Sequence, residues 1–419
     1  MLTEETNDEL TRVGPGTPMG EVLRHYWYPV AMVRELEEKR TKRVRLLGED
    51  FVVYRQRNGE YGIVAERCPH RGASLAYGMV EEDGIRCSYH GYKFDLTGKC
   101  TDMPNFPPES PYRRKMCAKM GEAQALGGLV FAYVGQGEAP ELPRYEAWIK
   151  PGIRDIGHCV VPCNWLQIME NSVDPYHVEA LHGRYFEYMG EDQGFKAPSS
   201  FLKKHERIGF DVFDHGIIKR RILEGQTEES DDWKIGHPLV WPYMMWVGGN
   251  GIYQMQLRVP IDDAHTWVAF YSVHAPKDVD LSHETTCVDY PIPFIDDEGE
   301  HITDYIEGQD IMAWVSQGPI ADRTKEFLGE GDIGVIQLRK MARDCVAAVK
   351  DGRDPVAVVR EPHESIELPL ERSKFGAGVE FCVQWLNRGS ARYSPIKGQL
   401  EKLHLDAAIA RGEHPVAAE

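Results

Sequence analysis

Short apolar runs separated by turn-forming residues fill the chain between residues 42 and 134. The runs are rich in Val, Ile, Phe and Tyr, and Gly48 and Asn58-Gly59 lie between neighbouring runs. Runs of this length between glycine or asparagine turns are typical of strands in antiparallel hairpins. The predicted strands are residues 44–47, 51–54, 62–65 and 129–134. The pattern indicates a small antiparallel β domain.

A second pattern, of mixed strands and helices, follows the proline-rich stretch 140–151, which we predict to be a linker. Apolar and polar residues alternate along 252–261, and a partner strand is predicted at 266–274. Residues 332–350 have the apolar spacing of an amphipathic helix. Because these strands and helices do not alternate as in βαβ units, the predicted fold class is α+β.

The chain is therefore expected to have three parts. An N-terminal entry segment, residues 1–40, leads into the small β domain, residues 41–140. Residues 141–419 are expected to form a larger domain with an antiparallel sheet and helices, on which the entry segment packs. Two domains fit a length of 419 residues.

Composition and charge exclude several classes of protein. Apolar residues make up 42% of the chain and charged residues 27%, as in soluble globular proteins. A net charge of −18 argues against nucleic-acid binding, which needs a basic surface. Residues 1–10 show no signal peptide, and no apolar run approaches the ~20 residues of a membrane helix. The nine scattered cysteines are expected to be mostly reduced thiols of a cytoplasmic protein.

The most informative motif combines cysteine and histidine in two short loops, Cys68-Pro69-His70 and Cys87-Ser88-Tyr89-His90. A [2Fe–2S] cluster with two cysteines on one iron and two histidines on the other needs this ligand set. A zinc site is the alternative, but zinc loops usually pair cysteine with cysteine and histidine with histidine. We therefore predict that Cys68, His70, Cys87 and His90 hold an iron–sulfur cluster.

A second candidate metal site lies at His177 and His182. Pro175 and Gly183 suit the start and the end of a helix over residues 174–182. Residues five apart diverge on a regular α-helix, so both imidazoles reach one metal only if the helix bulges near His182, and π-type bulges gather at functional sites. Two histidines and a distant carboxylate form the facial triad of non-heme Fe(II) sites. Two incidental helical histidines are the alternative.

Together these motifs resemble the Rieske non-heme iron oxygenases. Their pattern N-W-x4-E-N-x2-D-x2-H-x4-H is matched by Asn164, Trp165, Glu170, Asn171, Asp174, His177 and His182. The ligand loops have no spare cysteine, unlike those of respiratory Rieske proteins. The resemblance covers most of the chain and is strongest to the single-subunit oxygenases of the phthalate dioxygenase and aryl O-demethylase type.

This resemblance implies a Rieske [2Fe–2S] domain and a helix-grip-like catalytic domain that binds a mononuclear Fe(II). It also implies a homotrimer that takes electrons from an NAD(P)H-dependent reductase with a flavin or ferredoxin domain. The implied reaction is the O2-dependent hydroxylation or O-demethylation of an aromatic compound that carries a carboxylate or a methoxy group. A soluble Rieske-type electron carrier with an inactive mononuclear site is the alternative function.

The third iron ligand is expected to be a carboxylate far downstream of the histidines. The candidates are Asp304, Asp310, Asp322 and Asp332. The resemblance favours Asp310, because residues 308–314 are similar to the E-D-x4-E-A helix that carries the ligand in O-demethylase-like relatives. The chain departs from that element at Gln309. Asp322, beside Arg323, is expected to be a salt-bridge or cap residue.

Two further residues of the same motif have expected roles. Asp174 can accept the imidazole N–H of His177 and so fix its tautomer, and an N-cap before Pro175 is the alternative. The resemblance implies that Asp174 also bridges His177 to His90 of the partner subunit. Asn171 is expected either to orient water or oxygen or to be a buried structural amide.

Substrate-binding residues are the least marked in the sequence. Arg220, within Lys219-Arg220-Arg221, would share a strand face with Ile218 and Ile222, which could turn it inward to bind a carboxylate. A solvated strand edge is the simpler interpretation of this basic cluster. Arg258, on the predicted strand 252–261, is a second candidate anchor.

Overall fold

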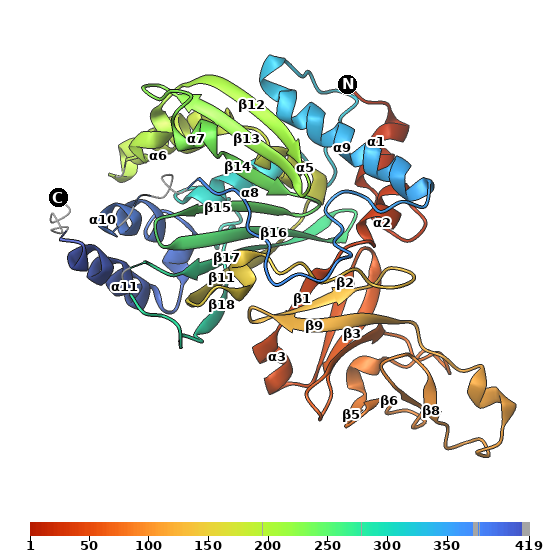
Figure 1. The fold of residues 1–419 in the computed structure, drawn as a ribbon. Coiled ribbons are helices and arrows are strands. Elements are labelled where there is room, and N and C mark those ends of the chain that lie inside the picture. The colour runs from red at the N-terminus through yellow and green to blue at the C-terminus, as the bar shows by residue number, and fades with distance from the viewer. Residues whose placement is uncertain (195, 278, 372–375, 377, 413–419) are drawn as a thin grey trace.

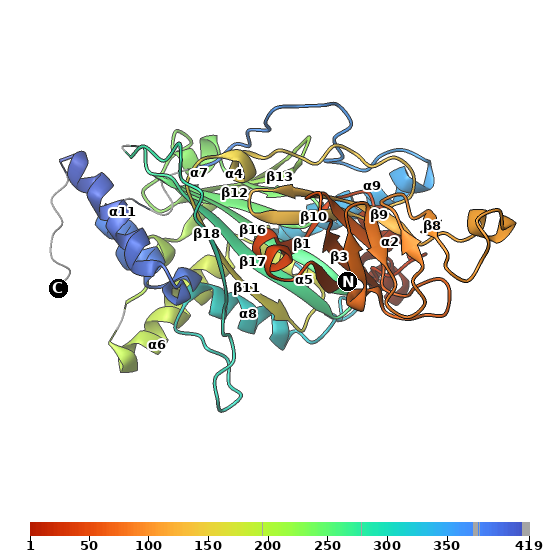
Figure 2. The ribbon, with the colours of Figure 1, turned by 90° about the horizontal axis from the view of Figure 1, so that it is seen from below.

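The computed structural model of the protein describes residues 1–194, 196–277, 279–371, 376 and 378–412. Figure 1 shows a smaller β part, drawn in red to orange, next to a larger part built around one long curved sheet. Figure 2 shows that α11 and β8 lie at opposite ends of the molecule. Strands and helices mix without a βαβ order, so the α+β prediction is confirmed.

The smaller part contains two antiparallel sheets. The first has six strands, in the order β1 (Tyr28–Met32), β10 (Leu129–Tyr133), β9 (Met120–Leu126), β4 (Tyr61–Ala65), β3 (Glu49–Arg55) and β2 (Thr41–Leu46). The second has four short strands, β5 (Met79–Glu81), β6 (Gly84–Arg86), β7 (Lys93–Phe94) and β8 (Cys100–Asp102). The predicted strands at 44–47, 51–54, 62–65 and 129–134 correspond to β2, β3, β4 and β10.

The larger part is built on an eight-stranded sheet. Its order is β12 (His205–Phe213), β13 (Gly216–Leu223), β14 (His237–Val240), β15 (Met244–Gly249), β16 (Ile252–Asp262), β17 (His265–His274), β11 (Ile153–Val161) and β18 (Cys287–Pro291). Neighbouring strands are antiparallel except β11 and β18, which run parallel. The long hairpin β16–β17 confirms the predicted strand pair.

Helices pack around both parts of the molecule, with residues 33–38 against β1, β2 and β3 of the smaller part. They are α1 (Glu4–Thr11), α2 (Pro18–Leu23), α3 (Val33–Glu38), α4 (Glu146–Ile149), α5 (Trp165–Ser172), α6 (Phe186–Gln193), α7 (Asp231–Lys234), α8 (Ile306–Ser316), α9 (Ile333–Lys350), α10 (Gly378–Phe381) and α11 (Lys397–Ala410), with π-helices η3 (Val178–Tyr185) and η6 (Cys382–Leu386). The helix α5 contacts β16 and packs against α8 and α9. Within the described part of the chain, no helix is long and apolar enough to cross a membrane.

The N-terminal segment divides between the two parts. Its helices α1 and α2 pack against α9. Its strand β1, however, pairs with β10 and completes the six-stranded sheet. Every residue of β10 is buried, so this strand needs a partner on each side. Pro29 is tolerated because β1 is an edge strand.

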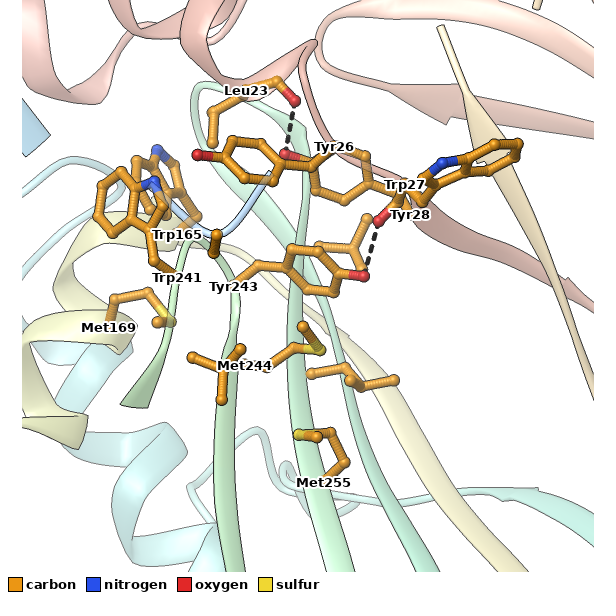
Figure 3. Close-up of a cluster of buried hydrophobic side chains, with 14 of the residues drawn as sticks. Leu23, Tyr26, Trp27, Tyr28, Trp165, Met169, Trp241, Tyr243, Met244 and Met255 are labelled. Carbon is orange, nitrogen blue, oxygen red and sulfur yellow. Dashed lines mark hydrogen bonds between the residues drawn. The ribbon is translucent and has the colours of Figure 1, made fainter. Parts of the chain in front are cut away.

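An aromatic core joins the two parts (Figure 3). The Tyr28 hydroxyl donates to the Leu23 carbonyl (2.9 Å), and the Tyr243 hydroxyl donates to the Trp27 carbonyl (2.7 Å). The rings of Tyr28 and Tyr243 lie 4.7 Å apart. The predicted linker 140–151 also belongs to this interface, because Trp148 within it is buried against the ring of Phe131. The orientation of the small part is therefore fixed by a shared core.

Acid is expected to destabilise the contact between α11 and β17, where the buried His274 and His404 face each other with Nδ1 and Nε2 3.0 Å apart. Burial lowers the pKa of His404 to about 4 and that of His274 well below its usual value. The unfolded chain therefore binds more protons below pH ~6.5, so stability is lost as the pH falls from ~6.5 to ~4, by roughly 3 kcal/mol for His404 alone. Urea unfolding between pH 8 and 4.5 checks this. His404→Gln should flatten the profile, whereas His283→Gln, at an exposed site, should leave it unchanged.

Candidate active site

Two loops with the same backbone geometry carry the cysteine–histidine motif. The N–H of Gly72 donates to the Cys68 carbonyl (2.8 Å), and the N–H of Gly91 donates to the Cys87 carbonyl (3.0 Å). Both glycines have φ of +74°, which a residue with a side chain adopts only with strain. The repeated turn brings both cysteines to the inside of the small part, where each is 2% exposed.

The histidines of these loops lie nearer the surface than the cysteines. The rings of His70 and His90 are 4.7 Å apart, and His70 stacks on the ring of Tyr92 at 4.3 Å. Burial, with a contribution from the nearby Cys87, raises the pKa of the Cys68 thiol to about 11, although backbone N–H groups of His70 and Arg71 act in the opposite direction. Two inner sulfurs, two outer imidazoles and N–H donors near sulfur fit a cluster with unlike ligands on its two irons.

The predicted bulge between His177 and His182 is present. Residues 178–185 form the π-helix η3, so the two rings face each other with centroids 5.3 Å apart. The sequence suggested that Gly183 lies just past the end of a helix. In the structure it lies inside the π-helix η3. A Cβ at Gly183 would lie 2.6 Å from the Phe201 carbonyl oxygen, so the glycine is required by a close backbone approach.

Asp310, on α8, completes a three-residue group with these histidines. Its Oδ1 lies 3.2 Å from His182 Nε2 and 3.8 Å from His177 Nε2. The three ligand atoms all lie within 4.8 Å of one another. Burial raises the pKa of Asp310, but the charges of His182 and His177 outweigh burial and lower the pKa below its usual value. The carboxylate is thus ionised beside two imidazoles.

A metal ion fits this donor set. Asp310 Oδ1 is buried and has no hydrogen-bond partner, although it faces two ring nitrogens. A buried carboxylate oxygen in that state costs free energy unless a cation binds it. Two imidazole nitrogens and one carboxylate oxygen on one side of a cavity are the ligands of a non-heme Fe(II) site with open positions.

The other candidate carboxylates are bound elsewhere in the structure. Asp304 pairs with Arg392 (2.7 Å), and Asp322 pairs with Lys325 (2.7 Å) on the exposed surface. Asp332 accepts the backbone N–H of Gly329 (2.7 Å). Among the four, Asp310 is therefore the one that the described geometry places beside both histidines.

Gln309 holds His182, a contact that the sequence analysis did not assign. The Gln309 Oε1 lies 3.0 Å from His182 Nδ1, and its Nε2 donates to the Thr303 carbonyl (3.0 Å). The second bond fixes the amide so that its oxygen faces Nδ1 of the ring, and Nε2 of His182 faces Asp310 on the other side. In the sequence, the one sign of a special role for Gln309 is that the chain departs from the E-D-x4-E-A pattern at this position.

Replacing Gln309 with leucine is expected to weaken metal binding at the histidine pair by about 10–100-fold, because the ring loses the acceptor that fixes its tautomer. Gln309→Glu keeps an acceptor and should bind metal nearly as well as the wild type. Titration of the apoprotein with Co(II), followed by its visible absorption, measures the difference. Equal affinity in the leucine variant and the wild type would contradict the role of Gln309.

Asp174 accepts a backbone N–H and lies close to the ring of His177. Its Oδ1 accepts the backbone N–H of Tyr176 (2.8 Å), as a helix-capping residue does. Its Oδ2 lies 3.6 Å from His177 Nδ1. Burial raises the pKa of Asp174, but its contact with His177 outweighs burial and the pKa is lowered. Each histidine thus has a polar partner behind it, Asp174 for His177 and Gln309 for His182.

A cavity opens beside the three-residue group. The residues that line it are Asn171, Ser172, His177, Val178, His182, Phe201, Lys219, Met245, Gln254, Gln256, Ile306, Glu307, Asp310 and Trp385. Asn171 also lines a second, open cleft together with Asp174 and His177, so this amide lies between the cavity and the surface.

The structure does not bring the two predicted arginine anchors to this cavity. Arg220 pairs with Asp211 and donates to the Lys234 carbonyl (2.6 Å), away from the lining residues. Arg258 is buried one layer behind the wall, where it donates to the Gln256 Oε1 (2.8 Å). Arg220 points outward because residues of a strand alternate between faces, so that its neighbour Lys219 takes the inner position.

Comparisons with known proteins agree with this geometry. A family model described as the Rieske [2Fe-2S] domain matches residues 26–119, and one described as LigXa C-terminal domain like matches residues 299–391. The 5,5'-dehydrodivanillate O-demethylase oxygenase subunit of Sphingobium sp. (strain NBRC 103272 / SYK-6) is 42% identical, over 88% of this chain and 86% of its own length. The chain belongs to the Rieske non-heme iron oxygenases. It is an oxygenase subunit of the phthalate dioxygenase and aryl O-demethylase type.

Other relatives of this Rieske oxygenase extend the same result. The phthalate 4,5-dioxygenase oxygenase subunit of Pseudomonas putida is 31% identical, over 94% of this chain and 96% of its own. The solved structure of NdmA from Pseudomonas putida CBB5 shares the fold, with 21% identity and a TM-score of 0.58 over 83% of this chain and 100% of that chain. The enzyme therefore contains a Rieske [2Fe–2S] cluster and a mononuclear non-heme iron. As an oxygenase subunit it takes electrons from a reductase or ferredoxin partner.

Proposed function

We propose that this Rieske oxygenase O-demethylates a methoxylated aromatic acid, with ring hydroxylation as the second candidate reaction. The observation that carries the proposal is the cavity beside His177, His182 and Asp310, which has apolar walls for a ring and a polar floor. Among the relatives, an O-demethylase oxygenase subunit has 42% identity and a phthalate dioxygenase oxygenase subunit has 31%. The relatives do not support the alternative of an electron carrier with an inactive second site.

In this proposal Cys68, His70, Cys87 and His90 hold the cluster, and His177, His182 and Asp310 hold the iron. When bound, the cluster supplies one-electron transfer and the iron supplies the position at which O2 is activated. The protein side chains orient these groups. Asp174 and Gln309 fix the tautomers of the two histidines, and Asn171, at the boundary of cavity and cleft, orients water or oxygen.

We further propose a head-to-tail homotrimer. In one chain the six-stranded sheet lies between the four short strands β5 to β8 and the helix α8 (Figure 1). Exposed aromatic side chains lie next to both sites, namely Tyr89 (58% exposed) beside His90 and Tyr176 (40% exposed) beside His177. A surface that buries both patches places His90 of the partner subunit against Asp174, and so joins the two metal sites through side chains.

We also propose a domain division and a cellular location for this enzyme. Residues 41–140 form the Rieske domain and residues 141–419 the catalytic domain, while residues 1–40 form an entry segment that contributes β1 to the first of these. A cytoplasmic enzyme fits the free cysteines, none of which is paired in the described residues. The proposed electron donor is an NAD(P)H-dependent reductase, because an oxygenase subunit takes its electrons from a partner protein.

A product screen tests the proposed function. Purified enzyme, a surrogate reductase, NADH and paired methoxylated and methoxy-free aromatic acids are incubated in air, and products are separated by liquid chromatography. O-Demethylation predicts one formaldehyde and one phenol for each O2 and each pair of electrons consumed. Hydroxylated products without formaldehyde would favour ring hydroxylation, and NADH oxidation without any organic product would contradict both reactions.

A further inference from the structure

We infer that a second, inner pocket behind the catalytic cavity binds a hydroxyl group at the far end of the substrate, and that Ser272 and His274 recognise this hydroxyl. The inference rests on the proposed function and deepens it, because a substrate that reaches this pocket has two linked aromatic rings. The methoxy group then lies in the catalytic cavity and the hydroxyl group lies on the distal ring.

The inner pocket adjoins the catalytic cavity, which is the cavity beside Asp310 and the two histidines. The side chains that line both are Gln254, Glu307 and Trp385. Beyond this boundary the polar side chains of the inner pocket are Asp155, Ser272, His274, Tyr290 and Ser390. Its floor is formed by β11, β17 and β16, which are neighbours in the eight-stranded sheet (Figure 1). The pocket is therefore an inward continuation of the active site.

A row of hydrogen bonds runs along this floor from the catalytic cavity into the inner pocket. Arg258 donates to Gln256 Oε1 (2.8 Å), and Gln256 Nε2 donates to Gln254 Oε1 (2.9 Å). Gln254 Nε2 then donates to the Ser272 hydroxyl oxygen (3.1 Å). Because that oxygen already accepts a bond, the O–H of Ser272 is oriented to donate onward. The row thus ends in a hydroxyl donor inside the inner pocket.

His274 lies at the end of this row. It is two residues beyond Ser272 in β17, so both side chains are on the same face of the sheet. The side chain of His274 is 1% exposed, and its Nδ1 lies 3.0 Å from His404 Nε2. Its Nε2 is buried and has no hydrogen-bond partner among the described residues. A buried polar atom in that state costs free energy, so its place in a pocket wall indicates a binding site.

The acidic groups of the inner pocket are bound by other side chains. Asp155 accepts the hydroxyls of Tyr290 (2.7 Å) and Ser394 (2.6 Å). Glu307 accepts the Ser390 N–H (2.7 Å) and hydroxyl (2.9 Å). The hydroxyl donor and the imidazole nitrogen of β17 are therefore the groups that the pocket offers to a ligand.

A hydroxyl group is the ligand chemistry that fits this pair. It has one donor and two acceptor sites, so it can accept from Ser272 and bond to His274 Nε2 whichever ring nitrogen carries the proton. Burial lowers the pKa of His274 well below its usual value, so the ring is neutral at pH 7.5. A neutral ring and a nearby carboxyl group, Asp155, do not favour an anion here.

The strand register gives the length of such a substrate. In the β16–β17 pair, Gln256 of the catalytic cavity lies opposite Phe270, and His274 lies opposite Ile252. The two positions are four residues apart along the strands, a span of about 13 Å. This span is longer than one substituted benzene ring, so we assign to the site a methoxylated acid with two linked rings.

Paired ligands test this inference on the wild-type holoenzyme, without reductant. The 2'-, 3'- and 4'-hydroxy isomers of 5-methoxybiphenyl-3-carboxylate and the matching methyl compounds are titrated by isothermal calorimetry at pH 7.5. We expect at least one hydroxy isomer to bind about fivefold or more tightly than its methyl partner, because a methyl group leaves both polar groups of the pocket unpaired. If no isomer does, the pocket holds at most a water molecule and the inference is overturned.

A one-ring pair tests the assigned length. For 3-hydroxy-5-methoxybenzoate and 3-methoxy-5-methylbenzoate, which are too short to reach His274, we expect Kd values within about threefold of each other. A preference for the hydroxyl as large as that of the biphenyls would place the contact in the catalytic cavity and overturn the inference.

Variants then assign the preference to the two residues. Ser272→Ala and His274→Phe should each reduce it to less than about twofold and change the Kd of the methyl partner by less than about threefold. The second value also shows that the buried site is still folded. Ser316→Ala, which removes an exposed hydroxyl of α8, is the control and should keep the full preference. Equal losses for both ligands in Ser272→Ala would show a structural role and overturn the inference.

Turnover separates this inference from the proposed function. In the wild type we expect KM to be lower for the preferred hydroxy isomer than for its methyl partner by the same factor as Kd. In Ser272→Ala that difference should disappear with full iron content and an unchanged Rieske absorption spectrum. If the hydroxy isomers bind with the expected preference but none loses its methyl group, the proposed reaction fails and the binding assignment stands.

Discussion

Replacing Asp310 with alanine is expected to remove the mononuclear iron and to abolish turnover, while the Rieske cluster stays intact. Asp310 supplies the one carboxylate oxygen in the group with His177 and His182, and two imidazoles alone bind Fe(II) weakly. The iron content should fall from about three to about two atoms per chain, as the two ligand sets imply, and iron analysis measures it. The visible absorption spectrum shows whether the two iron atoms of the cluster are still bound.

Asp304→Ala is the matched control for this experiment. Asp304 lies just before α8 and was a candidate ligand, but it pairs with Arg392. The variant should keep all of its iron even if it is less stable. Retained iron together with retained turnover in Asp310→Ala would show that another residue is the third ligand.

Replacing Asp174 with asparagine is expected to slow electron transfer between the two sites by about 10–100-fold with both metals still bound. Asparagine keeps an Oδ1 that accepts the Tyr176 N–H, so the helix cap is preserved. It replaces the oxygen that lies 3.6 Å from His177 Nδ1 with an amide that cannot accept the imidazole proton.

Single-turnover kinetics measure this effect. The prereduced enzyme is mixed with substrate and O2, and the rate at which the cluster absorption returns is compared between proteins. Asp322→Asn, an exposed carboxylate on the same open cleft, should behave as the wild type does. An unchanged rate in Asp174→Asn would argue against the bridge between neighbouring subunits.

Long elements with a strong pattern were predictable from the sequence. The helix expected at 332–350 is α9 (Ile333–Lys350), and the strands expected at 252–261 and 266–274 differ from β16 and β17 by one residue at an end. The bulge between His177 and His182 was predicted on chemical grounds, since two ligands five residues apart need it. For the helix and the two strands the local pattern was sufficient, and for the bulge the spacing of the two ligands was.

Features that depend on contacts between distant segments were not predictable. The pairing of β1 with β10 joins residues about a hundred positions apart, and no local signal marks it. The alternation in β13 showed that Lys219 and Arg220 face opposite sides, but the strand is buried on both, so it did not show which side faces the cavity. Gln309 became interpretable only once its amide was seen against His182.

Gly183 links the iron ligands to the selection of substrates. It belongs to the helix that carries His182, and it touches the backbone of Phe201, whose ring lines the cavity. A substitution at Phe201 that shifts its backbone is therefore expected to shift Gly183, and with it the helix turn that orients His182. Substitutions at Met245, which lies on β15 and also lines the cavity, are therefore expected to change substrate selection with less effect on His182 than substitutions at Phe201.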